Sequence, residues 1–258
     1  MATFRGDIFS TELQMTTGVN IYIPDGANNS RLKVLYLLHG MSDNCSNWFR
    51  LTGVELYARA YNLAIITPEV QRGFYTDMVS GLKYFSYVAD ELPKIMHAMF
   101  GLPLAREKNF VAGLSMGGYG ALKCALTYPD RYAGCGAFSS ACDVAFNVEK
   151  RYISSQQLGE LKAIFGDDLK VREQDDLFRL AEKCAQSSQT EKKPKILMTC
   201  GTSDSLLEQN HKLRDHLQRL GFEDFRYEEW EGDHTWTFWD QSIRMLFEYL
   251  FGKPKSAK

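Results

Sequence analysis

A single serine stands where the sequence predicts a sharp turn from a strand into a helix. The run 109–120 reads Asn-Phe-Val-Ala-Gly-Leu-Ser-Met-Gly-Gly-Tyr-Gly, with Ser115 near its middle. The short apolar stretch before the serine is typical of a strand covered on both faces, and the residues after it have helical spacing. At such a turn a serine hydroxyl stands clear of the backbone and can act as a nucleophile. Gly113 and Gly117 fit this interpretation, because side chains flanking so tight a turn would collide with the neighbouring strand or helix.

A nucleophilic serine needs a base and an acid, and both residue types follow later predicted strands. Asp204 lies in Gly-Thr-Ser-Asp after the apolar run 196–200, and His234 lies in Glu-Gly-Asp-His after the run 225–230. We interpret Ser115, Asp204 and His234 as a triad in which the imidazole takes the serine proton and the carboxylate orients the imidazole.

Alternatives exist for the acid and the base. Asp204 could instead cap the helix that follows it, and Asp143, which follows the predicted strand 132–138, is a rival acid. His39 adjoins a core strand, and the other histidines, His97, His211 and His216, lie in predicted helices. His234 is therefore the favoured base.

Acyl transfer also requires donors for a developing oxyanion. The amide of Met116 directly follows the serine, and the amide of Met41 follows His39-Gly40 at the end of a strong core strand. We expect these two amides to form the oxyanion hole and the two methionine side chains to line the acyl pocket.

Strands and helices alternate along most of the chain. Two segments near the N-terminus, 4–13 and 19–23, are expected to form an antiparallel edge. Further strands are predicted at 34–38, 63–67, 110–112, 132–138, 196–200 and 225–230, and helices at 53–61, after Ser115, and at 206–220 and 237–250. A helical face from 82 to 99 contains Pro93, which should kink that helix or mark a new start. This alternation predicts a single α/β domain over 1–258, with a mainly parallel central sheet and helices on both faces.

One segment interrupts the alternation. From 143 to about 193 the chain is polar and charged, with short helical patches near 156–165 and 176–184. An insertion after the carboxyl ends of two strands lies where open α/β sheets bind ligands, so we predict a small cap over the site. The alternative is a solvated surface excursion with no substrate contact.

Composition narrows the possible partners. The 258 residues are 45% hydrophobic and 24% charged, with a net charge of −2, so nothing favours nucleic acid or an anionic membrane. The six cysteines mostly lie in apolar patterns typical of reduced buried thiols, and neither they nor the five histidines show metal-ligand spacing. We expect no metal and no cofactor. The sequence has no apolar run typical of a secretory signal or a membrane span, so we expect a cytoplasmic protein. The sequence does not decide whether the protein forms homo-oligomers.

Four motifs together resemble a known family. They are Leu-Leu-His-Gly-Met-Ser at 37–42, Gly-Phe-Tyr-Thr-Asp at 73–77, the serine turn at 113–120, and Gly-Asp-His-Thr-Trp at 232–236. In this order they look like the tributyrin esterase branch of the esterase D group, which has the α/β-hydrolase fold. That group includes S-formylglutathione hydrolases and carbohydrate-directed feruloyl and acetylxylan esterases. The resemblance implies cofactor-free hydrolysis of short-chain carboxylic esters by the same three residues and two amides.

The resemblance leaves several functions to be separated. The first is a serine carboxylesterase acting on a small-molecule ester, and the second is deacylation of feruloylated or acetylated polysaccharide, for which Tyr75, Trp48 and Trp236 could offer stacking surfaces. An S-formylglutathione hydrolase typically has Gly-His-Ser where this chain has Gly-Leu-Ser, which disfavours the thioesterase alternative. A non-catalytic binding protein of the same fold is disfavoured because all three triad positions are filled.

Overall fold

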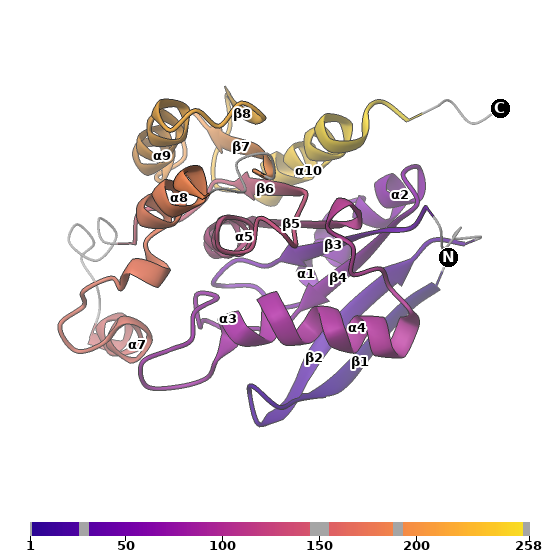
Figure 1. The fold of residues 1–258 in the computed structure, drawn as a ribbon, viewed down its shortest axis with the longest axis horizontal. Coiled ribbons are helices and arrows are strands. Elements are labelled where there is room, and N and C mark those ends of the chain that lie inside the picture. The colour runs from indigo at the N-terminus through magenta and orange to yellow at the C-terminus, as the bar shows by residue number, and fades with distance from the viewer. Residues whose placement is uncertain (1, 26–30, 145–154, 188–192, 255–258) are drawn as a thin grey trace.

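The computed structural model describes residues 2–25, 31–144, 155–187 and 193–254. Its centre is an eight-stranded sheet in the order β1-β2-β4-β3-β5-β6-β7-β8 (Figure 1). The strands are β1 Ala2–Ser10, β2 Met15–Ile23, β3 Lys33–Leu38, β4 Leu63–Pro68, β5 Asn109–Leu114, β6 Gly134–Phe138, β7 Lys195–Gly201 and β8 Phe225–Trp230. β1 pairs with β2 and β2 with β4 in antiparallel fashion, and the remaining pairs are parallel. The predicted antiparallel edge and parallel centre are both present.

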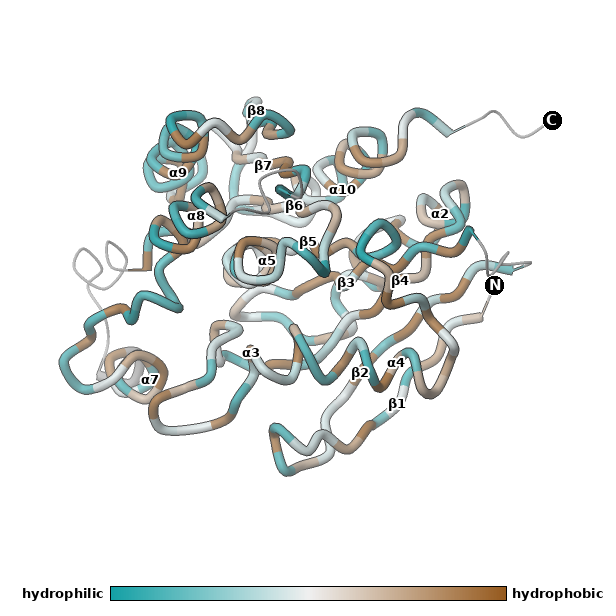
Figure 2. The backbone as a smooth tube through the Cα atoms, in the orientation of Figure 1, coloured by the Kyte–Doolittle hydropathy of each residue, from teal (hydrophilic) through white to brown (hydrophobic). Residues whose placement is uncertain are grey.

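Helices cover both faces of the sheet and create two apolar cores. On β3, Val34 and Tyr36 pack into one core, whereas the alternating Leu35 and Leu37 pack into the other. The first core includes residues of α3 Tyr84–Ser86, α4 Leu92–Phe100, α5 Met116–Thr127, α8 Leu177–Gln186 and α9 Leu207–Arg219. The second includes residues of α1 Asn47–Leu51, α2 Val54–Arg59 and α10 Trp236–Phe251. The central strands are buried on both faces, and their sequences are accordingly mostly apolar (Figure 2).

The helical segment before β5 changes its hydrogen-bond pattern ahead of Pro93. A π-helical stretch, Tyr87–Glu91, links α3 to α4, and Pro93 lies in the first turn of α4. A proline has no amide hydrogen and its ring crowds the carbonyl four residues earlier, so the regular ladder cannot pass through it. The irregularity expected at Pro93 is therefore realised as a wider turn before a new helix. Two short 3₁₀ helices, Arg106–Lys108 and Glu173–Asp175, lie in other connections.

The insertion between β6 and β7 contains α7, Ser155–Phe165, followed by α8. α7 lies next to the loop after β4 (Figure 1), and its residues Ile164 and Phe165 belong to the first core. In that loop the amides of Val79 and Ser80 donate to the carbonyls of Ile164 and Ala163, at 3.2 and 2.9 Å. The insertion is thus joined to the loop that precedes α3.

The base of the insertion is held by a buried ion pair. Lys123 of α5 and Asp175 are both buried, with Nζ and Oδ1 2.5 Å apart, and Arg172 contacts the second carboxylate oxygen of Asp175 at 2.5 Å. Burial lowers the pKa of Lys123, although the Asp175 charge acts in the opposite direction. An unpaired charge at this depth would be costly, so the pair couples the insertion to the helix that begins at the serine turn.

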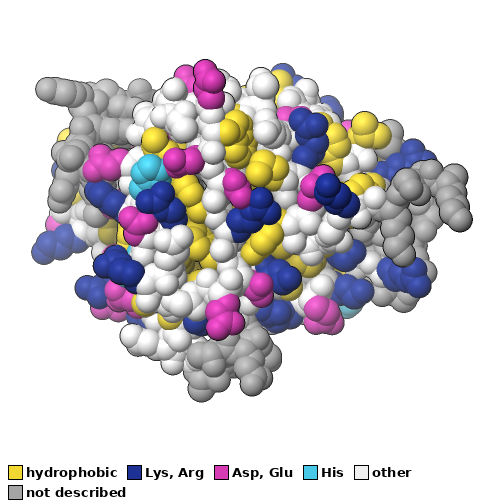
Figure 3. All heavy atoms as spheres, turned by 90° about the horizontal axis from the view of Figure 1, so that it is seen from above, with side chains coloured by type: hydrophobic (Ala, Val, Ile, Leu, Met, Phe, Trp, Pro, Cys, Tyr) yellow, Lys and Arg dark blue, Asp and Glu magenta, His cyan; other side chains and the backbone are white. Residues whose placement is uncertain are grey.

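The surface is mixed in charge. On the face shown in Figure 3, basic and acidic side chains are interspersed with apolar ones, in keeping with the net charge of −2. Across the described ranges, no helix is both long and apolar enough to cross a membrane.

The serine turn depends on two glycines. A Cβ added to Gly113 would lie 2.4 Å from the carbonyl oxygen of Gly117, and one added to Gly117 would lie 2.4 Å from that of Leu38. Both contacts are with backbone, which cannot rotate away as a flexible side chain can. The steric role predicted for the two glycines is confirmed, and it explains how α5 packs against β5 and the end of β3.

We predict that Gly113→Ala destabilises the protein by about 3 kcal/mol, at the upper end of the usual cost of overpacking a core. The matched control is Gly6→Ala in β1, where an added Cβ meets nothing within 4 Å. Chemical denaturation of both variants measures the difference. Equal stability of the two variants would contradict the close approach at the turn.

Candidate active site

Ser115 lies between β5 and α5 in a strained conformation, with φ of 54° and ψ of −117°. Its amide donates to the carbonyl of Phe138 on β6 at 2.8 Å, and its carbonyl accepts from the amides of Tyr119 and Ala141 at 3.2 and 3.1 Å. Residues persist in such sparsely populated backbone regions only where their surroundings enforce them. The turn predicted from the sequence is present, and three backbone hydrogen bonds hold it.

A cavity of about 470 Å³ opens beside the serine. Its lining includes Ser115 and Met116 from the turn, Gly40 and Met41 from the loop after β3, and His234 from the loop after β8. Most of the other lining side chains are apolar, namely Phe74, Leu114, Ala141, Leu161, Ile164, Leu206, Trp236 and Trp239. Residues far apart in sequence therefore meet around one apolar space, which is the usual character of a small-molecule site.

Asp204 and His234 are directly bonded. His234 Nδ1 lies 2.8 Å from Asp204 Oδ2, and the amide of Leu206 donates to Asp204 Oδ1 at 2.9 Å. Burial acts to raise the pKa of Asp204, but the hydrogen bond and charge of His234 outweigh it, so this pKa lies below its usual range. The carboxylate therefore stays ionised, leaving His234 Nδ1 as the donor and Nε2 free of that bond.

The loops after β7 and β8 bring this pair together. The amides of Thr202 and Ser203 donate to the carbonyls of Trp230 and Gly232, at 3.0 and 2.9 Å. A Cβ on Gly201 would lie 2.4 Å from the Gly232 carbonyl oxygen, so the approach of the two loops requires glycine there. The rival acid, Asp143, instead has its amide bonded to Gln209 Oε1 at 3.0 Å.

The two predicted oxyanion donors occupy the cavity wall beside Ser115. Met116 is the first residue of α5, and the amides of a first helical turn have no acceptor within their own helix. Met41 follows Gly40, whose position allows close contact: an added Cβ would lie 2.7 Å from Leu114 Cδ1 and 3.7 Å from Ser115 Cβ. Both methionines line the cavity.

Of the three aromatic residues expected to contact substrate, one lines the cavity. Trp236 does so, but Tyr75 and Trp48 are fully buried and the expectation for them is wrong. Phe74 and Tyr75 have positive φ, 53° and 50°. Phe74 lies on the cavity wall, whereas the Tyr75 hydroxyl donates to the buried carbonyl of His39 at 3.0 Å.

Trp48 supports the site from behind. Its indole N–H donates to the Leu38 carbonyl at 2.9 Å, and its ring packs edge-on against Trp236 with centroids 5.2 Å apart. The sequence alone does not show which side chains of an irregular loop or a short helix face a cavity, and for this reason Tyr75 and Trp48 were wrongly assigned to the substrate pocket.

A charged pair at the cavity wall was missed by the sequence analysis. Arg72, after β4, makes a two-pronged hydrogen bond to Glu160 of α7, with its Nη2 2.8 Å from Glu160 Oε2. Both residues line the cavity together with Leu161 and Ile164 of the same helix. α7 thus forms part of the cavity wall. The sequence gives only a weak signal for this pair, because a single Arg and a single Glu are common surface residues and only the fold brings these two together.

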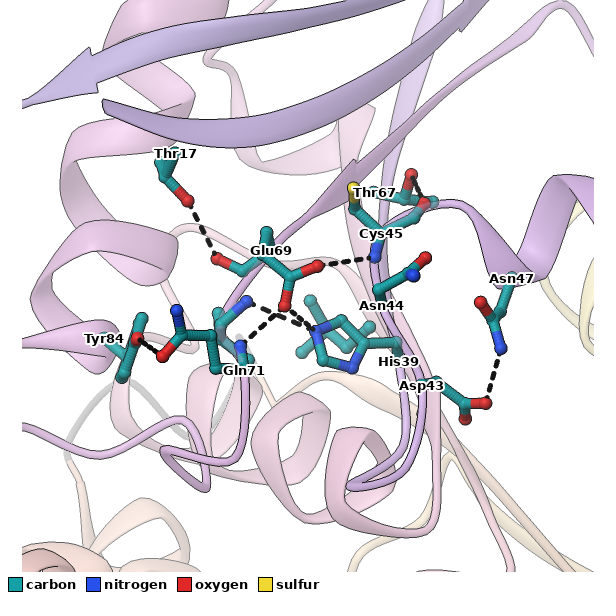
Figure 4. Close-up of polar contacts among 12 residues, drawn as sticks. Thr17, His39, Asp43, Asn44, Cys45, Asn47, Thr67, Glu69, Gln71 and Tyr84 are labelled. Atoms are coloured by element: carbon teal, nitrogen blue, oxygen red, sulfur yellow. Dashed lines mark hydrogen bonds and ion pairs between the residues drawn. The ribbon is translucent and has the colours of Figure 1, made fainter. Parts of the chain in front are cut away.

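A second polar network is centred on His39 and Glu69 (Figure 4). His39 is fully buried, and its Nε2 lies 3.3 Å from Glu69 Oε1. Glu69 also accepts from the amides of Cys45 and Gln71, at 3.0 and 2.7 Å. Burial would raise the pKa of Glu69, but the bond and charge of His39 and these amides lower it to about 2. A buried histidine beside an ionised carboxylate was not anticipated from the sequence.

Residues 10–247 match the family model described as putative esterase. The chain belongs to this esterase family. It is therefore a carboxylic ester hydrolase with the α/β-hydrolase fold. Within residues 2–25, 31–144, 155–187 and 193–254, no three side chains of the types that bind metals come together in a group that could hold a metal ion.

Three relatives extend this result to nearly the whole chain. An acetyl esterase of Caldicellulosiruptor saccharolyticus is 32% identical over 97% of this chain and 98% of its own. The substrate-bound structure of FphF, a fluorophosphonate-binding serine hydrolase of Staphylococcus aureus, has a TM-score of 0.87 and 31% identity, covering 98% of this esterase and 99% of FphF. An S-formylglutathione hydrolase, FrmB, of the same organism has a TM-score of 0.84 and 30% identity, covering 97% and 98% of the two chains. The expected relationship with the esterase D group is confirmed, and the narrower tributyrin branch stays a prediction.

We predict that Asp204→Asn lowers kcat for ester hydrolysis by up to about 10⁴, because asparagine keeps the shape but favours the wrong imidazole tautomer. Asp143→Asn, the matched control, should change kcat by less than about threefold. Steady-state kinetics of the two variants on one p-nitrophenyl ester measure the contrast. A crippled Asp143→Asn beside a nearly normal Asp204→Asn would assign the acid to the other loop.

Proposed function

We propose that this esterase is a serine carboxylesterase that hydrolyses short-chain acyl esters through an acyl-enzyme intermediate. The observation that carries the proposal is the bond between His234 Nδ1 and Asp204 Oδ2, 2.8 Å, in a cavity that Ser115 and His234 line together. A neutral imidazole whose Nδ1–H is held by a carboxylate has Nε2 available as a base.

The reaction follows from these groups. His234 Nε2 takes the proton of Ser115 Oγ as the oxygen attacks the ester carbonyl, and the tetrahedral oxyanion accepts from the amides of Met41 and Met116. His234 then gives the proton to the departing alcohol, leaving the acyl group on Ser115. A water molecule repeats the sequence against the acyl-enzyme and releases the acid. Asp204 stays ionised throughout and stabilises the imidazolium.

The size and lining of the cavity favour substrates with short acyl groups. Its volume of about 470 Å³ has to hold both the acyl and the alcohol parts of the substrate. The Arg72–Glu160 pair at its wall would be partly desolvated by a long alkyl chain, which is unfavourable for charged groups. The 32% identity with an acetyl esterase agrees with this preference.

A thioester substrate is the second candidate, favoured by the 30% identity with an S-formylglutathione hydrolase. The chemistry of attack would be the same, since a thioester carbonyl reacts through an equivalent tetrahedral adduct. Assays on S-formylglutathione and on methyl ferulate, run beside simple esters, separate this candidate and the feruloyl esterase alternative from the proposed one.

The first test removes the nucleophile. Ser115→Ala should lower kcat by at least about 10⁴ while the thermal unfolding midpoint stays within a few degrees of wild type, because the triad acts as a unit. A fluorophosphonate probe should label wild type and spare the variant. Ser205, which also lines the cavity, provides the matched control: Ser205→Ala should still be labelled. If the Ser115→Ala variant were labelled at the wild-type rate, Ser115 would not be the nucleophile.

The second test concerns acyl length. We expect kcat/KM on p-nitrophenyl esters to be higher for acetate to butyrate than for palmitate. Leu161→Ala should raise the octanoate-to-butyrate ratio about fourfold or more, since each additional buried methylene contributes about 0.8 kcal/mol. Leu158→Ala on the same helix is the control, because Leu158 is exposed and does not line the cavity. A palmitate preference in wild type would refute the proposed substrate class.

A further inference from the structure

His39 is bonded to the peptide that carries a proposed oxyanion donor. Its Nδ1 lies 2.7 Å from the carbonyl oxygen of Gly40, which also accepts from the amide of Asp43 at 3.1 Å. The Gly40 carbonyl and the Met41 amide belong to one planar trans peptide, so they point in opposite directions. A ring that holds this carbonyl on the buried side therefore directs the Met41 N–H to the opposite side. Gly40 and Met41 border the cavity, whereas His39 is fully buried.

The proton on His39 Nδ1 follows from its partner. A carbonyl oxygen can only accept, so a 2.7 Å contact requires Nδ1 to carry hydrogen. Nε2 faces two groups, the amide of Val70 at 3.2 Å and Glu69 Oε1 at 3.3 Å. A neutral ring accepts from the amide, and a protonated ring donates to the carboxylate. In both states Nδ1–H continues to hold the Gly40 carbonyl.

Glu69 fixes the far side of the ring. Its carboxylate is bonded to the amides of Cys45 and Gln71, so it joins the end of β4 to the loop that follows Gly40 (Figure 4). The backbone of His39 is held as well, because its carbonyl accepts from Tyr75 at 3.0 Å. The imidazole thus lies in a rigid setting, with one nitrogen directed to the oxyanion peptide and the other to Glu69.

We propose that His39, held by Glu69, is a positioning residue that aims the Met41 amide at the oxyanion formed on attack by Ser115. The inference rests on the proposed serine esterase function and adds to it a buried pair that contacts no substrate. It follows that loss of the Nδ1 donor should weaken binding of the transition state and leave ground-state binding nearly unchanged.

The test compares two replacements of similar size. His39→Asn keeps an N–H donor near the Nδ1 position, and His39→Leu lacks one. We expect His39→Leu to lower kcat on p-nitrophenyl butyrate about 10- to 100-fold, with KM within about threefold of wild type. A trifluoromethyl ketone with a matching acyl chain, whose adduct with serine carries an oxyanion, should lose affinity by a similar factor. His39→Asn should stay within about fivefold of wild type in both measurements.

His211→Leu is the matched control, because His211 also pairs with a glutamate, Glu229 at 2.6 Å, but on the exposed surface. It should behave as wild type. Equal losses in His39→Leu and His39→Asn, or an unchanged ketone affinity in His39→Leu, would overturn the proposal. If His39→Leu does not fold, Glu69→Gln takes its place. We then expect the Glu69→Gln variant to bind the ketone about fivefold more weakly than wild type does. An affinity equal to that of wild type would overturn the proposal. Failure of the proposed function would show separately, as a wild type without esterase activity or an active Ser115→Ala.

Discussion

The close approach of backbone around Ser115 is the constraint on which the rest of the site depends. A serine at φ 54° and ψ −117° is held there because its amide is bonded to β6 and because α5 packs against the end of β3 without any intervening side chain. That single steric arrangement fixes three things together. It exposes the hydroxyl, it places the first amide of α5 beside it, and it sets the separation between the serine and the Gly40–Met41 loop. Strain of this kind costs roughly 1–3 kcal/mol and is maintained only by well-packed surroundings.

The parallel part of the sheet supplies the remaining groups at one edge. Parallel strands end on the same side, so the loops after β3, β5, β7 and β8 all reach the cavity. Electrostatics then determines how the groups pair. A carboxylate as buried as Asp204 would be costly without a partner, and the contact with His234 offsets that cost. The same principle applies to His39 and Glu69, where a buried ring and a carboxylate secure the loop that carries Met41.

The insertion is held to this frame by two ion pairs of different character. Lys123 and Asp175 are almost completely buried, so breaking that pair would leave an uncompensated charge in the core, at a cost of about 3–5 kcal/mol. Arg72 and Glu160 are 41% and 30% exposed, and a pair so accessible to water contributes about 1 kcal/mol or less. The α8 end is therefore firmly anchored to α5. The α7 end, which lines the cavity, depends more on its apolar contacts and on backbone bonds to the loop before α3.

Local pattern in the sequence was enough to predict the serine turn, the order of strands and helices, the antiparallel edge and the residues that follow β7 and β8. These features depend on local patterns in the chain: apolar periodicity, glycine at a crowded turn, and proline in the first turn of α4. The choice between Asp204 and Asp143 as the partner of His234 needed the structure, because it depends on which two loops are adjacent. The same holds for the placement of Phe74 on the cavity wall with Tyr75 behind it, for the Arg72–Glu160 pair, and for the buried contact of His39 with Glu69. Each of these joins residues that are distant in sequence or reversed by an irregular turn, and only tertiary packing sets the distances over which a hydrogen bond or an ion pair can form.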